Sequence, residues 1–363
     1  MGARPGGRDR RVTASQAATA RVPRRRGGTF ATRRPGAAGR HLATTDPGAP
    51  LKILVPSTIA LDVQAGPDDE VVVYDAAAPF RPEDSDAEVL VVWASSAENL
   101  ADAAARLRRV RWVQTLAAGP DAVLAAGFGP DVTITSGRSL HDGPVAEHAL
   151  ALVLACVRRL DALGAAQREH RWDLAVNRGQ SDPATAALYT LDGARVTIWG
   201  FGSIAARLAP LLAALGAHVT GVAGTRGERH GFPVVSDDDL PDVLATTDVL
   251  ISLLPALATT RHAFDAARID QLPDHAVFVN VGRGATVDED ALVAALRDGR
   301  LGAAALDVTE TEPLPAASPL WDAPRLLLTP HVAGNRPQRA SELVNANLDA
   351  LRAGRPLRNV VPR

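Results

Sequence analysis

The chain has very little cysteine, lysine or aromatic side chain: one Cys, one Lys and 4% aromatic residues among 363. The single thiol, Cys156, excludes an intramolecular disulfide and a cysteine-based metal site. No His, Cys and carboxylate residues stand at metal-ligand spacing, so we expect no metal. The apolar run 149–157 around Cys156 is too short to span a bilayer and predicts a buried helix with an unreactive thiol. We therefore expect a cytoplasmic protein without a membrane partner.

Charge is divided unevenly along the chain. Residues 1–50 hold eleven Arg and no Lys and carry +9, whereas the remainder carries −11, which gives the net charge of −2. Because nucleic-acid binding needs clustered cations, the acidic remainder is not expected to bind nucleic acid. The basic leader, residues 1–50, has too few apolar residues to fold and no hydrophobic stretch typical of a secretory signal. We expect it to be disordered or to be translated upstream sequence, with targeting or a nucleic-acid-binding arm as the alternatives.

Short β-rich runs alternate with helical stretches from residue 51 onward. The runs expected to form strands are 51–55, 70–74, 89–93, 111–116 and 132–135 in a first series, and 195–199, 218–223, 249–253, 276–280, 301–307 and 326–329 in a second. A long apolar helix at 145–160, with Pro144 in its first turn, separates the two series, and a helix over 338–351 follows the second. This alternation predicts an α/β fold of two doubly wound parallel-sheet domains facing a cleft, the first flavodoxin-like and the second of the Rossmann type.

A glycine-rich turn opens the second series. The strand 195–199 runs into Gly200-Phe201-Gly202-Ser203-Ile204-Ala205, followed by an apolar helix over 204–215. Gly200 permits a tight turn, Gly202 leaves room for backbone N–H groups to approach a pyrophosphate, and Ala205 allows close packing of helix and strand. The helix N-terminus adds positive potential. Strand, turn and helix in this register predict a dinucleotide site.

The next strand indicates which dinucleotide. NAD sites usually place Asp or Glu at its end to hold the ribose hydroxyls, but here Ala223 occupies that position. Thr225 and Arg226 follow and are suited to a 2′-phosphate, which favours NADP(H) over NAD(H). The alternative is that Arg226 is a solvated loop residue.

Three polar residues follow strands of the second series. Arg283 follows the strand 276–280, Glu312 follows 301–307 and His331 follows 326–329. The carboxyl ends of parallel strands line one edge of a sheet, so these side chains are expected to converge. A protonated His can donate to the carbonyl oxygen of a 2-oxo acid, a carboxylate can hold that His in place, and an Arg can bind the substrate carboxylate.

Together these segments resemble the D-isomer-specific 2-hydroxyacid dehydrogenase family, which includes glyoxylate/hydroxypyruvate reductases, phosphoglycerate dehydrogenases and D-lactate dehydrogenases. The resemblance covers essentially residue 51 to the end. The segments that carry it are 200–205, 254–255 with Thr260, 280–284, 307–313, 330–334, 347–348 and 354–361.

The resemblance implies that His331 is the acid/base, Glu312 its partner and Arg283 the substrate-binding residue. It also implies that Asp307 contacts the nicotinamide carboxamide, and that the loop of Ala118 and Gly119 binds the substrate carboxylate through backbone N–H groups. The residues expected to contact the cofactor are Gly200, Phe201, Gly202, Ser203, Ile204, Thr225, Arg226, Leu254, Pro255, Thr260, Val281, Asp307 and Gly334.

Domain limits and a dimer also follow from the resemblance. We expect the leader at 1–50, a discontinuous substrate-binding domain at 51–143 and 331–363, and a dinucleotide-binding domain at 144–330. Residues 145–148 resemble the start of a helix that helps form the family's dimer interface, so a homodimer is expected. His141, His148 and His170 are accordingly expected to be structural.

The expected reaction moves a hydride between NAD(P)H and carbon 2 of a small 2-oxo or 2-hydroxy acid, such as glyoxylate or hydroxypyruvate. The loop 139–143 departs from the forms usual in the family, so the substrate stays open. One alternative is a non-enzymatic dinucleotide sensor like the family's co-repressor branch, against which the intact Arg283, Glu312 and His331 argue. A phosphonate- or formate-oxidising relative shares the fold, but formate dehydrogenases typically carry Gln where this chain has Glu312.

Overall fold

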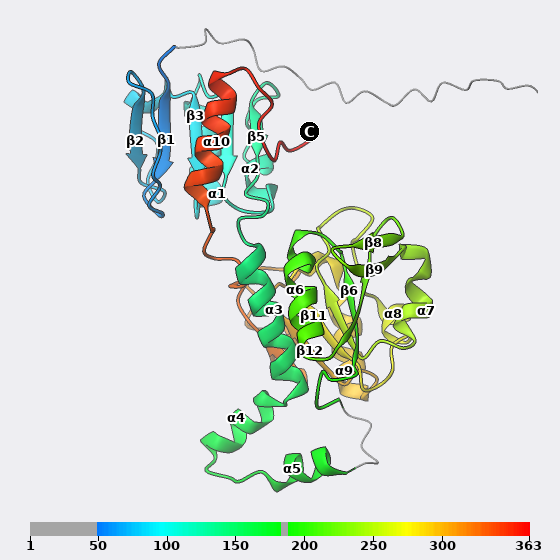
Figure 1. The fold of residues 1–363 in the computed structure, drawn as a ribbon. Coiled ribbons are helices and arrows are strands. Elements are labelled where there is room, and N and C mark those ends of the chain that lie inside the picture. The colour runs from blue at the N-terminus through cyan, green and yellow to red at the C-terminus, as the bar shows by residue number, and fades with distance from the viewer. Residues whose placement is uncertain (1–48, 183–187) are drawn as a thin grey trace, which may run out of the picture. The chain divides into compact units, whose positions relative to one another are not determined.

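The computed structural model describes residues 49–182 and 188–363, which form an α/β protein with two sheets (Figure 1). The first sheet is entirely parallel and has the order β2-β1-β3-β4-β5. Its strands are β1 Lys52–Pro56, β2 Glu70–Tyr74, β3 Val89–Val92, β4 Trp112–Thr115 and β5 Thr133–Thr135. This is the flavodoxin-like order, as the sequence predicts.

Helices cover both faces of the first sheet, and one of them comes from the far end of the chain. η1 (Pro82–Asp84), α1 (Ala97–Arg106) and α2 (Asp121–Ala125) lie between its strands in the sequence. α10 (Ala340–Arg352), red in Figure 1, lies against the same sheet, because Val344 and Leu348 share a core with Ile53 and Val89. The Asn347 side chain donates to Gln114 Oε1 at 2.9 Å and so fixes α10 on the sheet.

The second sheet has the order β13-β12-β11-β10-β6-β7-β9-β8. Its strands are β6 Arg195–Trp199, β7 His218–Val222, β8 Gly227–Arg229, β9 Phe232–Val235, β10 Val249–Ser252, β11 Val277–Asn280, β12 Ala303–Leu306 and β13 Leu326–Leu328. Every pairing is parallel except that of β8 with β9. The chain leaves β6 toward β7 on one side and later returns to β10 on the other. Ligands of open α/β sheets bind at such a switch point.

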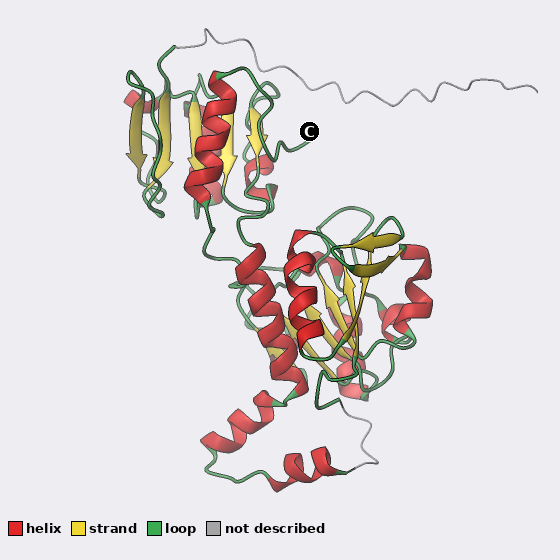
Figure 2. Cartoon of the chain, viewed as in Figure 1, coloured by secondary structure: helices red, strands yellow, loops and turns green. Residues whose placement is uncertain are grey.

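Two helical layers cover the second sheet, as Figure 2 shows. α3 (Asp142–Val157) and α6 (Ser203–Ala214) pack against each other in one apolar core. α7 (Leu240–Leu244), α8 (Ala266–Ile269) and α9 (Glu289–Asp298) contribute to a second core, with the short turns η2 (Asp237–Asp239), η3 (Gly284–Thr286) and η4 (Pro319–Asp322) between elements. Because both faces are covered, β10, β11 and β12 are buried at every position, which explains their continuous apolar sequence.

The structure corrects two details of the predicted elements. The long helix expected to reach residue 160 ends at Val157, because Arg159 adopts a left-handed conformation (φ 55°) before α4 (Leu160–Arg168) and α5 (Leu174–Ser181). The hairpin β8–β9 was not predicted, because its first strand is only three residues long and lies between glycines. The expected domain limits remain a prediction, and the leader lies outside the described residues as far as residue 48.

Candidate functional site

The glycine-rich turn joins β6 to the N-terminus of α6. Gly200 has φ 100°, and a Cβ there would lie 2.9 Å from the Leu253 carbonyl oxygen, so this position requires glycine. A Cβ at Gly202, in contrast, would meet nothing within 4 Å, which leaves the backbone beside it open to a ligand. Ser203 donates its hydroxyl hydrogen to Asp142 Oδ1 at 3.1 Å, and Ala205 is fully buried. An open backbone at the first turn of a twelve-residue helix fits a pyrophosphate.

The loops after β10 and β11 pack directly on each other. A Cβ at Gly282 would lie 2.7 Å from the Leu254 carbonyl oxygen, so glycine lets the two backbones approach. Thr260 donates to the Pro255 carbonyl at 2.6 Å and closes the loop after β10. Leu254 and Val281 are both buried. The structure thus gathers these predicted cofactor-contacting residues at the switch point.

Arg283 sits on a rigid backbone at the end of β11. Asn280 is fully buried; its amide donates to the Arg283 carbonyl at 3.1 Å, and its oxygen accepts from Gly282 N at 3.0 Å. Thr286 donates to the same carbonyl at 2.6 Å. The sequence analysis did not single out Asn280 or Thr286, whose signal is a polar residue at each end of the Arg283 loop.

The Arg283 guanidinium reaches the loop of Ala118 and Gly119. A Cβ at Gly119 would lie 2.3 Å from Arg283 Nη2, and Arg283 Nε lies 4.0 Å from Asp121 Oδ2. Arg283 also donates to the Gly282 carbonyl at 2.7 Å, and its side chain remains 32% exposed. The structure therefore brings together the residues that the sequence analysis expects to bind the substrate carboxylate.

His331 and Glu312 form a direct pair. His331 Nδ1 lies 2.7 Å from Glu312 Oε2, while Glu312 Oε1 accepts from the backbone N–H of Thr309 at 3.1 Å. The carboxylate is thus held by its own loop on one oxygen and contacts the imidazole with the other. Their side chains are 48% and 38% exposed. Because the pair uses Nδ1, the Nε2 edge of His331 remains available to a substrate oxygen.

Two further carboxylates tether the loop that carries Glu312. Glu310 Oε1 lies 2.7 Å from Arg261 Nη2 and 3.2 Å from His262 Nε2, and its backbone N–H donates to Glu289 Oε1 at 2.6 Å. Burial opposes ionisation of Glu310, but the contacts with Arg261 and His262 outweigh it and lower its pKa. Burial raises the pKa of Glu289. A Cβ at Gly284 would overlap the Thr309 carbonyl, so the Arg283 loop also packs closely on this one.

Asp307 is buried at the end of β12 and lies against the His331 loop. Its Oδ1 accepts from Thr329 Oγ1 at 2.6 Å and from Val332 N at 3.0 Å, and its Oδ2 accepts from Ala333 N at 3.0 Å. His148 Nε2, from α3, lies 3.3 Å from Oδ1. Gly334 follows, with the buried His141 beside it. The sequence analysis placed Asp307 in the cofactor site and did not foresee these internal partners.

In the loop after β7 and the hairpin that follows, Arg226 and Arg229 both contact residues of the protein itself. Arg226 donates to Asp239 Oδ1 at 2.5 Å and to Ser236 Oγ at 3.3 Å. The residue that contacts Thr225 is Arg229, at the end of β8, which donates to Thr225 Oγ1 at 2.6 Å and to the Phe201 carbonyl at 3.3 Å. Arg229 therefore links the glycine-rich turn to the loop after β7. The sequence analysis missed it because the hairpin that carries it was not predicted.

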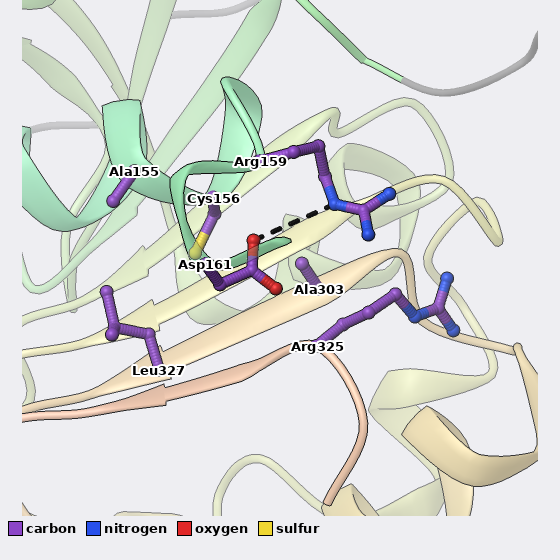
Figure 3. Close-up of a pocket in the computed structure, with 7 residues that line it drawn as sticks. All are labelled: Ala155, Cys156, Arg159, Asp161, Ala303, Arg325 and Leu327. Atoms are coloured by element: carbon purple, nitrogen blue, oxygen red, sulfur yellow. Dashed lines mark ion pairs between the residues drawn. The ribbon is translucent and has the colours of Figure 1, made fainter. Parts of the chain in front are cut away.

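Cys156 lies outside this constellation. It is buried near the C-terminal end of α3, and Figure 3 shows its thiol in a small recess lined by Ala155, Ala303 and Leu327, with an Arg159–Asp161 ion pair of 3.8 Å at the edge. Burial raises the pKa of the thiol to about 12, so it is protonated at neutral pH and a poor nucleophile. Among the residues that the structure describes, no three His, Cys, Asp or Glu side chains gather as metal ligands, and no helix is long and apolar enough to cross a membrane.

Three comparisons with known proteins bear on this site. The family model for "D-isomer specific 2-hydroxyacid dehydrogenase, NAD binding domain" matches residues 150–333. The glyoxylate/hydroxypyruvate reductase A of Salmonella newport (strain SL254) is 34% identical over 286 residues, which cover 76% of this chain and 86% of that protein.

Solved structures agree with the family match. The NADPH-dependent glyoxylate/hydroxypyruvate reductase of Sinorhizobium meliloti, in complex with NADP and sulfate, has a TM-score of 0.70 and 29% identity, covering 86% of this chain and 98% of that one. A D-isomer specific 2-hydroxyacid dehydrogenase from Xanthobacter autotrophicus Py2, in complex with NADPH and MES, has a TM-score of 0.68 and 31% identity, with the same coverage of 86% and 98%.

Proposed function

The chain belongs to the D-isomer specific 2-hydroxyacid dehydrogenase family, and we propose that it reduces glyoxylate, hydroxypyruvate or a similar small 2-oxo acid at carbon 2 with NADPH. As a member of this family it is an NAD(P)-dependent oxidoreductase that acts on CH–OH groups. The observation that carries the proposal is the 2.7 Å contact between His331 Nδ1 and Glu312 Oε2, because it orients the imidazole and leaves Nε2 toward a substrate.

His331 acts as the acid in the direction of reduction. Negative charge develops on the carbonyl oxygen as carbon 2 is reduced, and a proton on Nε2 can pass to that oxygen. Glu312 accepts a hydrogen bond from Nδ1 and so keeps Nε2 directed at the substrate before and after the transfer. In the direction of oxidation the neutral Nε2 accepts the hydroxyl proton.

Arg283 and the loop of Ala118 and Gly119 bind and orient the substrate. The guanidinium supplies paired N–H donors that match a carboxylate, and the backbone N–H groups of the loop add neutral donors beside it. The packing of Gly119 on Arg283 Nη2 supports a shared anion site for these two elements. Holding the carboxylate at fixed points presents carbon 2 and its oxygen to the cofactor and to His331.

The glycine-rich turn and the loops after β10 and β11 would hold the dinucleotide, which supplies the hydride when bound. The open backbone at Gly202 fits the pyrophosphate, while Leu254, Pro255 and Val281 supply an apolar wall at the carboxyl ends of the strands. Phe201, Ser203, Ile204, Thr260, Asp307 and Gly334 complete the proposed set of cofactor contacts.

Arginines near Thr225 support NADP(H) as the preferred cofactor. Ala223, not a carboxylate, stands at the end of β7 where an NAD site would hold the ribose hydroxyls, and Arg229 and Arg226 bring two cations to this loop. Arg229 already donates to Thr225, so the two side chains together offer a hydroxyl and a guanidinium to a 2′-phosphate. Two structural neighbours with complexes of NADP or NADPH support the same preference.

A panel of 2-oxo acids tests the proposal directly. Purified protein is incubated with NADPH and, separately, NADH, together with glyoxylate, hydroxypyruvate, pyruvate and a branched 2-oxo acid, and cofactor oxidation is followed by absorbance. We expect the fastest oxidation with glyoxylate or hydroxypyruvate and a preference for NADPH. Silence over the whole panel, or a large preference for NADH, would contradict the corresponding part of the proposal.

We also propose that the protein acts as a homodimer. Large apolar side chains are exposed on α4 and around α5, namely Leu160 (53%), Leu163 (37%), Trp172 (88%) and Leu174 (50%). Such a gathering on a water-facing surface is typical of an interface, and the family resemblance favours a second copy as its partner. Light scattering of Trp172→Glu should give a smaller mass than the wild type, whereas Leu215→Glu, at an exposed apolar position just after α6, should not change it. An unchanged mass for Trp172→Glu would exclude this surface.

A further inference from the structure

We propose that Asp307, Thr329 and His148 form a clamp that positions His331, so that His148 and Thr329 are positioning residues of the reaction. The inference rests on the proposed role of His331 as the acid/base. The three residues come from distant parts of the chain: His148 from α3, Asp307 from the end of β12 and Thr329 from the end of β13.

The clamp acts first on the backbone of the His331 loop. Three consecutive backbone N–H groups donate to Asp307. His331 N–H donates to the main-chain carbonyl oxygen of Asp307 at 2.7 Å. Val332 N–H donates to its Oδ1 and Ala333 N–H to its Oδ2, both at 3.0 Å. His331 itself has φ 50°, in the left-handed region that a residue with a side chain rarely adopts. The main-chain carbonyl of Asp307 binds His331, and its buried carboxylate binds the next two N–H groups; together they hold the segment in this conformation and aim the imidazole at Glu312.

Thr329 and His148 fix the carboxylate in turn. Thr329 gives its hydroxyl hydrogen to Asp307 Oδ1 at 2.6 Å, so its oxygen is left as an acceptor. His148 Nε2 lies 3.1 Å from that oxygen and 3.3 Å from Asp307 Oδ1, and both atoms can only accept. His148 Nε2 must therefore carry a hydrogen and donate, which fixes the tautomer of the neutral ring. Without this donor, the carboxylate would lose one of the groups that orient it.

A contact between Asp307 and the nicotinamide carboxamide is compatible with the clamp. Oδ1 accepts from Thr329, Val332 and His148, whereas Oδ2 accepts from Ala333, and a carboxylate oxygen can accept a second hydrogen bond. Substitution of Asp307 would therefore disturb both roles. Substituting His148 or Thr329 separates the two roles, because the side-chain contacts of these residues lie within the clamp and the Asp307 carboxylate is kept.

The experiment compares two matched pairs of variants. His148→Leu removes the ring N–H donor and Thr329→Val removes the hydroxyl donor. The matched variants His148→Gln and Thr329→Ser each keep a hydrogen-bond donor at the same position. In His148→Leu and in Thr329→Val we expect kcat with NADPH and glyoxylate to fall about tenfold or more, because each variant loses one charge-assisted hydrogen bond. The KM for NADPH should stay within about twofold, and the Gln and Ser variants should retain kcat to within about threefold. Glu147→Gln, at an exposed neighbouring position on α3, serves as the control.

Amide hydrogen exchange over residues 330–334 gives a second readout that needs no turnover. Exchange of the His331, Val332 and Ala333 amides should be faster in His148→Leu and Thr329→Val than in the wild type and unchanged in Glu147→Gln. If His148→Leu and Thr329→Val both show the kcat and the amide exchange of the wild type, the proposed clamp is wrong. A raised KM for NADPH with an unchanged kcat would also contradict the proposal, because it would show that these residues serve cofactor binding. If the wild type shows no turnover at all, the proposed function fails, and the exchange data still decide whether the clamp exists.

Discussion

The two ends of the candidate site are built differently. At the proposed nicotinamide end, Gly282 lets the loop after β11 pack on the loop after β10, and Gly284 lets it pack on the loop after β12. The buried Asp307 binds the loop after β13. At the proposed adenosine end, the exposed Arg226 pairs with Asp239 of η2, and the half-buried Arg229 donates to Thr225 and to the Phe201 carbonyl. The first end is fixed by packing, so it tolerates little change of geometry. The second is fixed by charge and can be retuned by substituting single side chains.

The largest effect is expected at the nicotinamide end. His331→Gln should lower kcat by roughly 10³-fold, because general acid–base catalysis contributes about 10²–10⁴-fold. NADPH binding, measured by fluorescence titration, should stay within about twofold. If His331→Gln turns over like the wild type, His331 is not the acid/base of the reaction.

A smaller loss is expected from Glu312→Gln. The amide keeps the size and can still contact Nδ1, but it loses the charge that favours the imidazolium. A hydrogen bond to a charged group is worth about 1.5–3 kcal/mol, so kcat should fall about 10- to 100-fold. Steady-state kinetics at constant pH measure this. An effect as large as that of His331→Gln would mean that the carboxylate does more than orient and polarise the imidazole.

At the adenosine end we expect a change of cofactor preference instead of a loss of chemistry. Arg229→Gln should weaken NADPH binding about tenfold and leave NADH binding and the limiting kcat nearly unchanged, because it removes a charged donor to the 2′-phosphate. Arg226→Gln should have a smaller effect, since Arg226 is already paired with Asp239. Equal losses with both cofactors would show that Arg229 acts through the Phe201 carbonyl and the glycine-rich turn.

The smallest effect on catalysis is expected for a buried carboxylate far along the chain from the reacting residues. Asp69 pairs with Arg352 of α10 and accepts from the N–H groups of Leu51 and Gly66; burial opposes its ionisation, but these donors outweigh it and lower its pKa. Because the pKa falls on folding, the ionised group stabilises the protein above its ordinary value of 3.8, and this stabilisation is lost as the pH falls through the lowered value.

Asp69→Asn should therefore lower the free energy of unfolding at pH 7 by about 2 kcal/mol without changing kcat. The difference from the wild type should shrink below about pH 4. Denaturant titrations at several pH values measure both. Asp349→Asn is the control, since Asp349 also pairs with Arg352 but is 62% exposed, and it should cost under about 0.5 kcal/mol. A difference that persists at low pH would contradict the linkage.

Features with a local sequence pattern could be predicted from the sequence, whereas features set by long-range packing could not. Strands 70–74 and 195–199 were predicted at their observed limits, because runs of β-branched and aromatic residues favour strands. This holds even though β2 is an edge strand with exposed Val71 and Val73, whereas β6 is buried at every position after its first. His331, Glu312 and Arg283 were chosen as candidates because polar residues at the carboxyl ends of parallel strands are expected at one edge of the sheet, and the structure places His331 and Glu312 in contact. The turn at Arg159 was missed because no glycine or proline marks it: arginine is a good helix former, and the left-handed conformation of Arg159 has no local signal.

Other features had no local signal. The contact between His148 and Asp307 joins residues far apart in the sequence, and neither carries a pattern that pairs it with the other. Arg229 lies on a three-residue strand between glycines, which a sequence pattern cannot separate from a loop. Long-range side-chain networks and short edge strands are set by packing and were therefore visible only in the structure.

The most direct test of the account follows the hydride itself. NADPH deuterated at carbon 4 of the nicotinamide is incubated with glyoxylate and either the wild type or His331→Gln, and the product is analysed by mass spectrometry and NMR. The account predicts one deuterium at carbon 2 of the product with the wild type, formed roughly 10³-fold more slowly by the variant. Product without deuterium at carbon 2, or equal rates in the two proteins, would contradict it.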